Sequence, residues 1–275
     1  MNFNEVHQTY TKINTLYKRD EKGNIVIGDF SRPEFEYLFN CKWRAFYKID
    51  GTNMSYYWDG HEMQIHGKSE SAQSPKHLLK KMQELLTVEK LQEVFPLKYD
   101  ENGNEIPFIV RIYGEGYGAK IQKCGGSYIK NDCNFRVFDI KINQYWLDWE
   151  NVIDICEKLN LEMTIPYGEM TLAEAEDMVV KGFKSPIAEN PELDAEGLVL
   201  RPVIQLYNKQ HERIMVKIKT RDYRKCGITY NVPAYVKVYF PEAGDVILRP
   251  DTAFSACVDN AEKVFLGDTI DILPN

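Results

Sequence analysis

The sequence has 275 residues, of which 44% are hydrophobic and 27% are charged, and its net charge is −7. This length suits one large domain, or one domain with a small appendage, and the composition excludes an intrinsically disordered chain. The negative charge excludes a protein held to nucleic acid mainly by bulk positive charge, but it allows a local basic groove.

Neither membrane insertion nor secretion is indicated by the sequence. No apolar run approaches the roughly 18–20 residues that a membrane helix needs, and the N-terminal segment lacks the apolar core of a signal peptide. The six cysteines are scattered without a C-x-x-C pair, which argues against a zinc site or a disulfide framework. We therefore expect a cytoplasmic protein with reduced thiols and no membrane partner.

Short strands dominate the first part of the chain. Gly23-Asn24 is expected to be a turn that leads into a short strand. Residues 45–67 predict two or three strands, AFYKI, MSYYW and EMQIHG, with WDGHE as the hairpin between the last two. The segment from Lys48 to Gly51 predicts a tight turn between the first two strands. Lys48 is then either a solvated lysine at a hairpin or an amine that is held in place and acts as a nucleophile.

Helices are predicted from apolar spacing and from capping residues. Residues 76–95 place apolar side chains at helical spacing, with a break expected near Thr87. Residues 148–160 and 171–182 also predict helices. Thr171 with a glutamate three residues later is typical of a capping box at the start of the second of these helices.

The second part of the chain predicts further strands. FIVRIYGEGYG is expected to be a buried strand that runs into a glycine-rich bend, and NFRVFDIKI, EGLVLRP and RIMVKIKT predict strands after it. We predict an α+β fold of mostly antiparallel sheets with flanking helices. The domain boundary is expected after Thr220, with residues 1–220 as the main domain and 221–275 as a small C-terminal β-rich appendage.

Two lysines near the end of the predicted main domain share one face of a strand. Lys217 and Lys219 alternate with Val216 and Ile218, so both lysines lie on one side of the strand and the apolar residues on the other. Two cations that face Lys48 across a phosphate site would lower the pKa of its amine and hold a triphosphate. For VKIKT considered alone, the polar face of an edge strand is the alternative.

The chain contains six motifs in order: KIDGTN (48–53), HGKSE (66–70), RIYGEGYG (111–118), FRVFDI (135–140), EGLVLRP (196–202) and VKIKT (216–220). Over roughly residues 40–220 this series resembles the covalent nucleotidyltransferase superfamily of polynucleotide ligases and messenger-RNA capping enzymes. Within it, the sequence is most similar to ATP-dependent RNA ligases of the double-strand nick-sealing type. The resemblance implies that residues 1–220 form a nucleotidyltransferase (adenylation) domain.

The resemblance implies a reaction in which RNA ends are joined through a covalent lysyl-AMP. Lys48 would take AMP from ATP, with Lys217 and Lys219 as the other catalytic residues. The AMP would pass to a 5′-phosphate end, and a 3′-hydroxyl would then displace it and close the backbone. ATP and Mg²⁺ or Mn²⁺ would be the cofactors, RNA ends or nicks the substrate, and the protein would be a monomer.

The resemblance also assigns residues to the nucleotide and the metal ion. Glu115 would hydrogen-bond the ribose, and Phe138 would stack on adenine unless it only packs in the core. Glu196 would help to hold Mg²⁺, and Asp50 would be a structural acid or an outer metal partner. Gly51 would permit the bend that presents the nucleophile. The nucleotide-binding set is Tyr47, Lys48, Asp50, Gly51, Lys68, Glu115, Phe138, Glu196, Lys217 and Lys219.

Two positions depart from the family pattern. Lys68 stands where relatives often have an arginine that contacts ribose or phosphate, and a lysine lacks the guanidinium fork. Tyr47 precedes the expected nucleophile at a position where many relatives carry a glutamate. If that glutamate helps to select the base, the preference for ATP needs another source here.

Basic residues that could meet RNA follow two of the motifs. They are interleaved with Tyr117, Tyr128 and Tyr223 as candidate base contacts, and solvated surface charge is the alternative. The basic residues are Lys120, Lys123, Lys130, Arg221, Arg224 and Lys225.

Other functions share parts of this pattern. A DNA ligase uses the same core but usually carries an oligonucleotide-binding barrel after the last lysine motif, and only 56 residues follow Lys219. A capping guanylyltransferase shares the first motif, and a non-catalytic nucleic-acid-binding relative would keep the fold without the chemistry. No motif distinguishes RNA from DNA, because none identifies the contacts to a 2′-hydroxyl.

Overall fold

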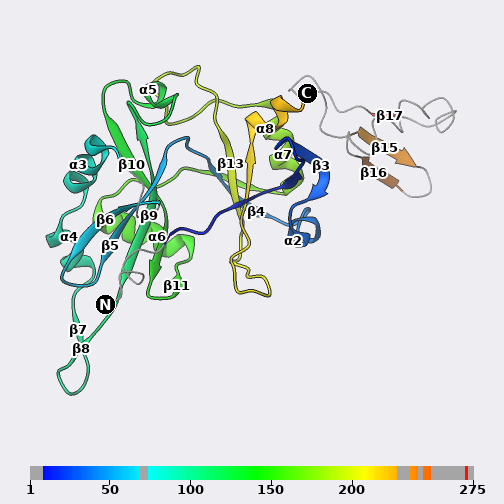
Figure 1. Cartoon of the computed structure of the whole chain (residues 1–275). Coiled ribbons are helices and arrows are strands. Elements are labelled where there is room, and N and C mark those ends of the chain that lie inside the picture. Colours follow the sequence, from blue (N-terminus) through cyan, green and yellow to red (C-terminus); the bar gives the residue numbers. More distant parts are fainter. Residues whose placement is uncertain (1–8, 69–73, 228–235, 241–243, 249–269, 272–275) are drawn as a thin grey trace. The chain divides into compact units, whose positions relative to one another are not determined.

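The computed structural model describes residues 9–68, 74–227, 236–240, 244–248 and 270–271 (Figure 1). The described residues fall into two compact units. The first unit takes in the chain up to Lys12, residues 49–165 and residues 186–193; the second takes in residues 13–48, 166–185 and the chain from Asp194 onward. The chain therefore passes from the second unit to the first directly after Lys48.

A five-stranded antiparallel sheet forms the centre of the first unit. Its strands follow the order β11-β10-β9-β5-β6, and each neighbouring pair is antiparallel. The β5–β6 hairpin, which the sequence predicts at WDGHE, is confirmed. The strands are β5 (Thr52–Trp58), β6 (Met63–Gly67), β9 (Val110–Gly118), β10 (Cys133–Ile142) and β11 (Tyr145–Trp146).

The first unit also contains helices, and two of them, α3 and α6, contact strand β10 of this sheet. The predicted break near Thr87 is confirmed. Thr87 has an extended backbone, and its hydroxyl accepts a hydrogen bond from the Lys90 N–H, so it begins a new helix. The helices are α3 (Lys76–Leu85), α4 (Val88–Val94), α5 (Gly125–Tyr128) and α6 (Trp149–Leu159), and a hairpin is formed by β7 (Lys98–Tyr99) and β8 (Glu105–Ile106).

A second five-stranded sheet forms the centre of the second unit, in the order β1-β14-β13-β4-β12. β1 runs parallel to β14, and the other pairs are antiparallel. The strands are β1 (Asn14–Thr15), β4 (Trp43–Tyr47), β12 (Pro166–Met170), β13 (Gly197–Pro202) and β14 (Val216–Lys219). The unit also contains the hairpin of β2 (Tyr17–Arg19) and β3 (Ile25–Phe30) and the helices α2 (Pro33–Tyr37), α7 (Leu172–Lys181) and α8 (Thr220–Lys225).

The hydrophobic core of the second unit lies against one face of its sheet. Trp43 of β4, Leu198 of β13 and Ile218 of β14 are buried there together with the apolar side of α7. This helix begins with the predicted capping box, in which the Thr171 hydroxyl accepts from the Glu174 N–H and the Glu174 carboxylate accepts from the Thr171 N–H. One face of the sheet thus packs against the core, and polar side chains can lie on the other face.

Two predictions of local structure are wrong. The segment Lys48–Gly51 is not a hairpin turn, because β4 pairs with β13 and β12 while β5 pairs with β9 and β6 in a different sheet. The glycine-rich bend is instead the end of β9, where Gly114 and Gly116 stay in register with both neighbouring strands. Close packing explains these glycines, since a Cβ on Gly114 would overlap Phe135 and one on Gly116 would overlap Leu78.

Part of the C-terminal region falls within the described residues. β15 (Val236–Phe240) pairs antiparallel with β16 (Gly244–Leu248) and with β17 (Ile270–Asp271). Most of the predicted appendage beyond residue 227 lies outside the described residues, so the boundary after Thr220 stays a prediction. None of the helices in the described ranges has the length and the apolar character that a membrane span requires.

Candidate active site

One face of the second sheet carries basic side chains, and the opposite face carries the core. Because β4, β13 and β14 pair without a register shift, successive residues alternate between the two faces. Arg44 and Phe46 alternate with the buried Trp43 and Ala45, and Lys48 continues the alternation. We call this side the basic face; it consists of Arg44, Phe46, Lys48, Val199, Arg201, Lys217 and Lys219.

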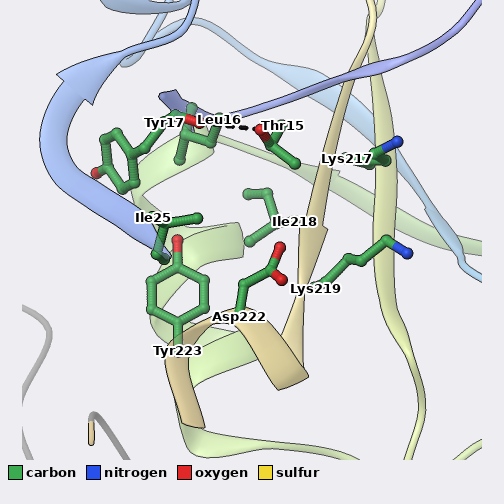
Figure 2. Close-up of a pocket in the computed structure, with 9 residues that line it drawn as sticks. All are labelled: Thr15, Leu16, Tyr17, Ile25, Lys217, Ile218, Lys219, Asp222 and Tyr223. Atoms are coloured by element: carbon green, nitrogen blue, oxygen red, sulfur yellow. Dashed lines mark hydrogen bonds between the residues drawn. The ribbon is translucent and has the colours of Figure 1, made fainter. Parts of the chain in front are cut away.

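Figure 2 shows the part of this sheet that β14 contributes. The amino groups of Lys217 and Lys219 point away from Ile218, Tyr17 and Tyr223, which lie on the core side around a small hollow. The same alternation appears in burial, because the apolar residues of β14 are fully buried and its lysines are partly exposed. The arrangement predicted from VKIKT is therefore confirmed, although the roles of the two lysines stay predictions.

Glu196 joins two of the predicted catalytic lysines. The Lys48 ammonium donates to Glu196 Oε2 at 2.6 Å, and the Lys219 ammonium donates to Glu196 Oε1, also at 2.6 Å. All three side chains are largely buried, with 10–19% of their surface exposed. Burial alone would raise the pKa of the Glu196 carboxyl, but the charges and hydrogen bonds of the two lysines lower the pKa overall. The structure therefore places a carboxylate, and not only cations, against Lys48.

The backbone at Gly197 determines where this carboxylate lies. The Lys48 N–H donates to the Gly197 carbonyl at 2.9 Å, and the Thr220 N–H donates to the Glu196 carbonyl at 3.0 Å. Gly197 has a φ of +145°, and a Cβ there would overlap the Ile218 carbonyl oxygen. Glycine is thus the residue that lets β13 begin this close to β14, directly after the bridging glutamate.

Replacing Glu196 by glutamine should lower the free energy of unfolding at pH 7 by about 2–4 kcal/mol, because Lys48 and Lys219 lose the negative charge between them while they stay mostly buried. The pKa of Glu196 is lowered in the folded protein, so its ion pairs contribute fully above the pKa of a free glutamate, about 4.3. The contribution is lost as pH falls through the folded pKa. The difference between wild type and variant should therefore be constant above about pH 5 and shrink below about pH 4.

Urea denaturation followed by circular dichroism at several pH values measures this difference. Asp29→Asn is the matched control, because it removes one carboxylate from an exposed ion pair with Lys18 at 2.6 Å. An exposed pair is worth less than about 1 kcal/mol. If Glu196→Gln were no more destabilising than Asp29→Asn, the bridging role of Glu196 would be wrong.

Tyr47 lies in an aromatic cluster of the second unit. Its ring centroid is 5.5 Å from that of Tyr167 and 5.7 Å from that of Phe183, and Phe183 packs against the hydrophobic core. Burial and the neighbouring Tyr167 raise the pKa of Tyr47. By strand alternation Tyr47 belongs to the core side of β4, opposite to Lys48, and its contact with the nucleotide stays a prediction.

Asp50 and Gly51 belong to the first unit, where three residues hold them. The Asp50 N–H donates to the Tyr128 hydroxyl at 3.2 Å, and the Asp50 carboxylate accepts from the Cys124 thiol at 3.1 Å. The Gln122 side chain donates to the Gly51 carbonyl at 3.0 Å. Sequence reasoning missed Gln122, Cys124 and Tyr128 as partners of the first motif, because no local pattern reports contacts more than 70 residues away.

Gly51 and Glu115 lie against each other in the first unit. A Cβ on Gly51 would overlap the Gly116 carbonyl oxygen and would lie 2.9 Å from Glu115 Cγ. Close approach, and not a tight turn, therefore explains why residue 51 is a glycine. Glu115 is half-buried and sits in register between Asn53 of β5 and Arg136 of β10.

Phe138 is the extra residue of a β-bulge. The β9–β10 register shifts between Val137 and Asp139, so the alternation of the partly exposed Arg136 and Phe138 with the buried Val137 ends at Phe138. The half-buried Phe138 ring packs edge-on against the Tyr10 ring, with 4.9 Å between the ring centroids. The Tyr10 hydroxyl donates to the buried Asp139 carboxylate at 2.7 Å. Stacking of Phe138 on adenine stays a prediction.

The remaining predicted contacts have mixed outcomes. Lys68 is exposed directly after β6, and the residues that follow it lie outside the described ones.

Tyr117, Tyr128 and Tyr223 are buried, with at most 3% of their surface exposed. The prediction that these tyrosines stack on bases is therefore wrong, because a buried ring offers no face to a ligand.

Comparison with models of protein families matches residues 42–219 to the family described as RNA ligase. Comparison with curated protein sequences finds no match.

Solved structures of an RNA ligase from Naegleria gruberi share the fold. A mutant with ATP and Mn is 17% identical with a TM-score of 0.52, covering 78% of this chain and 62% of that one. The enzyme with PPi is 18% identical with a TM-score of 0.52, covering 79% and 63%. A mutant with AMP and Mn is 16% identical with a TM-score of 0.51, covering 78% and 62%. At such identities the likeness shows the fold alone, and this chain spans slightly over three fifths of those chains.

The region matched by the family model begins just before β4 and ends with Lys219, so it contains the bridging Glu196 and parts of both units. It covers well over half of the chain, and the mixed α+β fold resembles the adenylation domain of the solved RNA ligases. The chain therefore belongs to the RNA ligase family.

Proposed function

We propose that this protein is an ATP-dependent RNA ligase that joins 3′-hydroxyl and 5′-phosphate ends through lysyl-AMP at Lys48. The observation that carries the proposal is the buried Lys48–Glu196–Lys219 bridge on the basic face. Membership of the RNA ligase family and the fold shared with structures that hold ATP or AMP support the same activity.

The bridge describes Lys48 before the first step of the reaction. An uncharged Lys48 amine attacks the α-phosphorus, a P–N bond forms, and the bond to pyrophosphate breaks. Because the pKa of Glu196 is lowered, its carboxylate is a weak base that keeps Lys48 in an ion pair before the nucleotide binds. Attack therefore requires this pair to open, with the Lys48 proton lost. Lys217 and Lys219 would offset the negative charge of the phosphates.

The donor set fits a divalent cation that keeps part of its water shell. No group of three or more His, Cys, Asp or Glu side chains that could hold a metal ion occurs among the described residues. Glu196 would then supply one carboxylate, and water and phosphate oxygens would complete the coordination, as Mg²⁺ commonly requires. Such an ion, Mg²⁺ or Mn²⁺, would neutralise phosphate charge. Asp50, whose carboxylate accepts from the Cys124 thiol, would be a structural acid or an outer metal partner.

The other nucleotide contacts form part of the proposal. Glu115 would bind the ribose hydroxyls, Phe138 would stack on adenine, and Lys68 would contact ribose or phosphate. The Glu115–Gly51 contact supports the first assignment, because it connects the ribose-binding residue to the motif that carries the nucleophile. The later steps transfer AMP to the 5′-phosphate and let the 3′-hydroxyl displace it. We also propose a duplex nick as the preferred substrate, a monomeric protein and a cytoplasmic location.

Incubation with ATP labelled at the α-phosphate and with Mg²⁺ or Mn²⁺ tests the first step. We expect label on the denatured protein and a mass increase of one AMP on the peptide that contains Lys48. A phosphoramidate also loses its label in acid and keeps it in alkali. Absence of an adduct on the wild-type protein would contradict the proposal, and labelling by GTP without ATP would indicate a capping guanylyltransferase instead.

Sealing assays on matched nicks test the substrate. We expect RNA nicks to be sealed faster than DNA nicks of the same sequence, and faster than single-stranded ends. Equal or faster sealing of DNA would favour the DNA ligase alternative, and an adduct without any sealing would limit the protein to nucleotidyl transfer.

A further inference from the structure

Two arginines oppose each other on the basic face, away from the lysines that bridge Glu196. Arg44 of β4 and Arg201 of β13 are cross-strand partners, so their side chains leave the sheet side by side. Like charges directly opposite each other destabilise a sheet. A pair of this kind is therefore expected where the two charges together serve to bind an anion.

Neighbouring side chains orient both guanidinium groups. Arg201 lies over the Phe46 ring, with its guanidinium carbon 4.9 Å from the ring centroid, and Phe46 itself is buried. Arg44 makes a longer ion pair, at 3.8 Å, with Glu169 of β12, whose side chain is half exposed. An aromatic ring and a carboxylate are thus among the groups that orient the two guanidinium groups.

Basic side chains gather on this face although the whole protein is acidic. Five of them, Arg44, Lys48, Arg201, Lys217 and Lys219, lie on it, and Glu169 and Glu196 are among the groups that contact them. The whole chain has a net charge of −7. Basic side chains gathered on one face of an acidic protein attract anions to that face.

Arg44 lies along β4 away from Lys48, whereas its partner Arg201 lies on β13, next to the strand that carries Lys217. Arg44 is four residues from Lys48, which corresponds to about 13 Å along an extended strand. A triphosphate whose α-phosphorus meets Lys48 is held by Lys217 and Lys219, on the strand on the other side of β13 from Arg44. The phosphates of a polynucleotide, by contrast, repeat along the chain and can meet both places at once.

We propose that Arg44 and Arg201 form a second anion site that binds a backbone phosphate of the RNA substrate, on the same sheet face as the point of joining. Two guanidinium forks suit one phosphate group, because each can donate two parallel hydrogen bonds. The site rests on the proposed ligase function for its substrate. It adds a phosphate contact at a distance from the nick. This contact positions the RNA strand along β4 and β13.

Binding of a fluorescent nicked RNA duplex to the full chain, measured over a range of salt concentrations, tests the site. Arg44→Gln and Arg201→Gln should each weaken binding by about tenfold, the value of a lost charged hydrogen bond. Each should also reduce the slope of log K against log salt by about 0.7–0.9, the share of one phosphate contact. Lys18→Gln, which removes one exposed charge from β2, is the matched control and should change neither quantity measurably.

Two further measurements separate this site from alternatives. Arg44→Lys keeps the charge but not the fork, so it should retain the salt slope and lose several-fold in affinity, and its melting temperature reports whether the fold is intact. Lysyl-AMP formation needs no RNA, so the glutamine variants should impair sealing far more than adenylylation.

The outcomes are distinct. If Arg44→Gln and Arg201→Gln had the same RNA affinity and salt slope as Lys18→Gln, the proposal of a second anion site would be wrong. Adenylylation that falls in parallel with RNA binding would also overturn it, in favour of a contact to the nucleotide. If the wild-type protein forms no lysyl-AMP, the ligase proposal fails, while the RNA affinities and slopes still decide whether the arginine pair binds a phosphate backbone.

Discussion

Replacing Lys48 by alanine should abolish formation of the AMP adduct, with a fall in rate of at least about 1,000-fold. The lysine amine is the atom that bonds to phosphorus, and loss of a nucleophile removes the covalent step itself. The rate is measured as label transferred from ATP to the protein in a single turnover. Sealing of RNA that carries a preformed adenylated 5′ end should persist, because that step needs no further transfer to Lys48.

Lys48→Arg is the informative control. Arginine keeps a positive charge that can pair with Glu196, but it stays protonated and cannot attack. The variant should therefore keep most of the stability of the wild type and still form no adduct. Adduct formation by Lys48→Arg, or a wild-type rate in Lys48→Ala, would show that another residue is the nucleophile.

Replacing Gly197 by alanine should both destabilise the second unit and remove the adenylylation activity. The new methyl group would overlap the Ile218 carbonyl oxygen and lie 2.9 Å from Lys219 Cα, so β13 and β14 would have to separate where Glu196 meets Lys219. We expect a loss of about 3–5 kcal/mol in the free energy of unfolding, from steric overlap together with backbone strain. Urea denaturation and the adduct assay measure the two effects.

Gly168→Ala is the control that measures the cost of backbone strain without steric overlap. Gly168 of β12 has the same φ, +145°, but a Cβ there would meet no atom within 4 Å. Strain alone costs about 1–3 kcal/mol, and adduct formation should be retained at temperatures where the variant is folded. If the two alanine variants lost stability and activity equally, close approach at Gly197 would not be what positions Glu196.

Several features were predictable because they depend only on neighbours in the chain. The capping box at Thr171 and the helix break at Thr87 follow from residues three positions apart, and both are confirmed. The alternation of Lys217 and Lys219 with buried residues follows from strand geometry alone, and the structure confirms it. The order of the six motifs led to the family that the family model then matched over residues 42–219.

Other features were not predictable because they depend on strand pairing across the chain. The sequence predicts a hairpin at Lys48, because two strand-like segments flank a turn-like one, yet those segments pair with distant partners in different sheets. The bulge at Phe138 has no local signal, because it arises from the pairing of β10 with β9. The interleaving of Tyr117, Tyr128 and Tyr223 with basic residues predicts accessible rings, and packing buries them.

The sequence by itself determined which residues are chemically able to take part: a lysine in KIDG, two lysines on one strand face, and an acid before a glycine. Only the tertiary structure decided that Glu196, 148 residues from Lys48, bridges Lys48 and Lys219, and that Arg44 stands opposite Arg201. The physical reason is that periodicity sets the face on which a side chain lies, whereas burial of whole sheet faces selects which strands pair. Pairing then decides which charges meet.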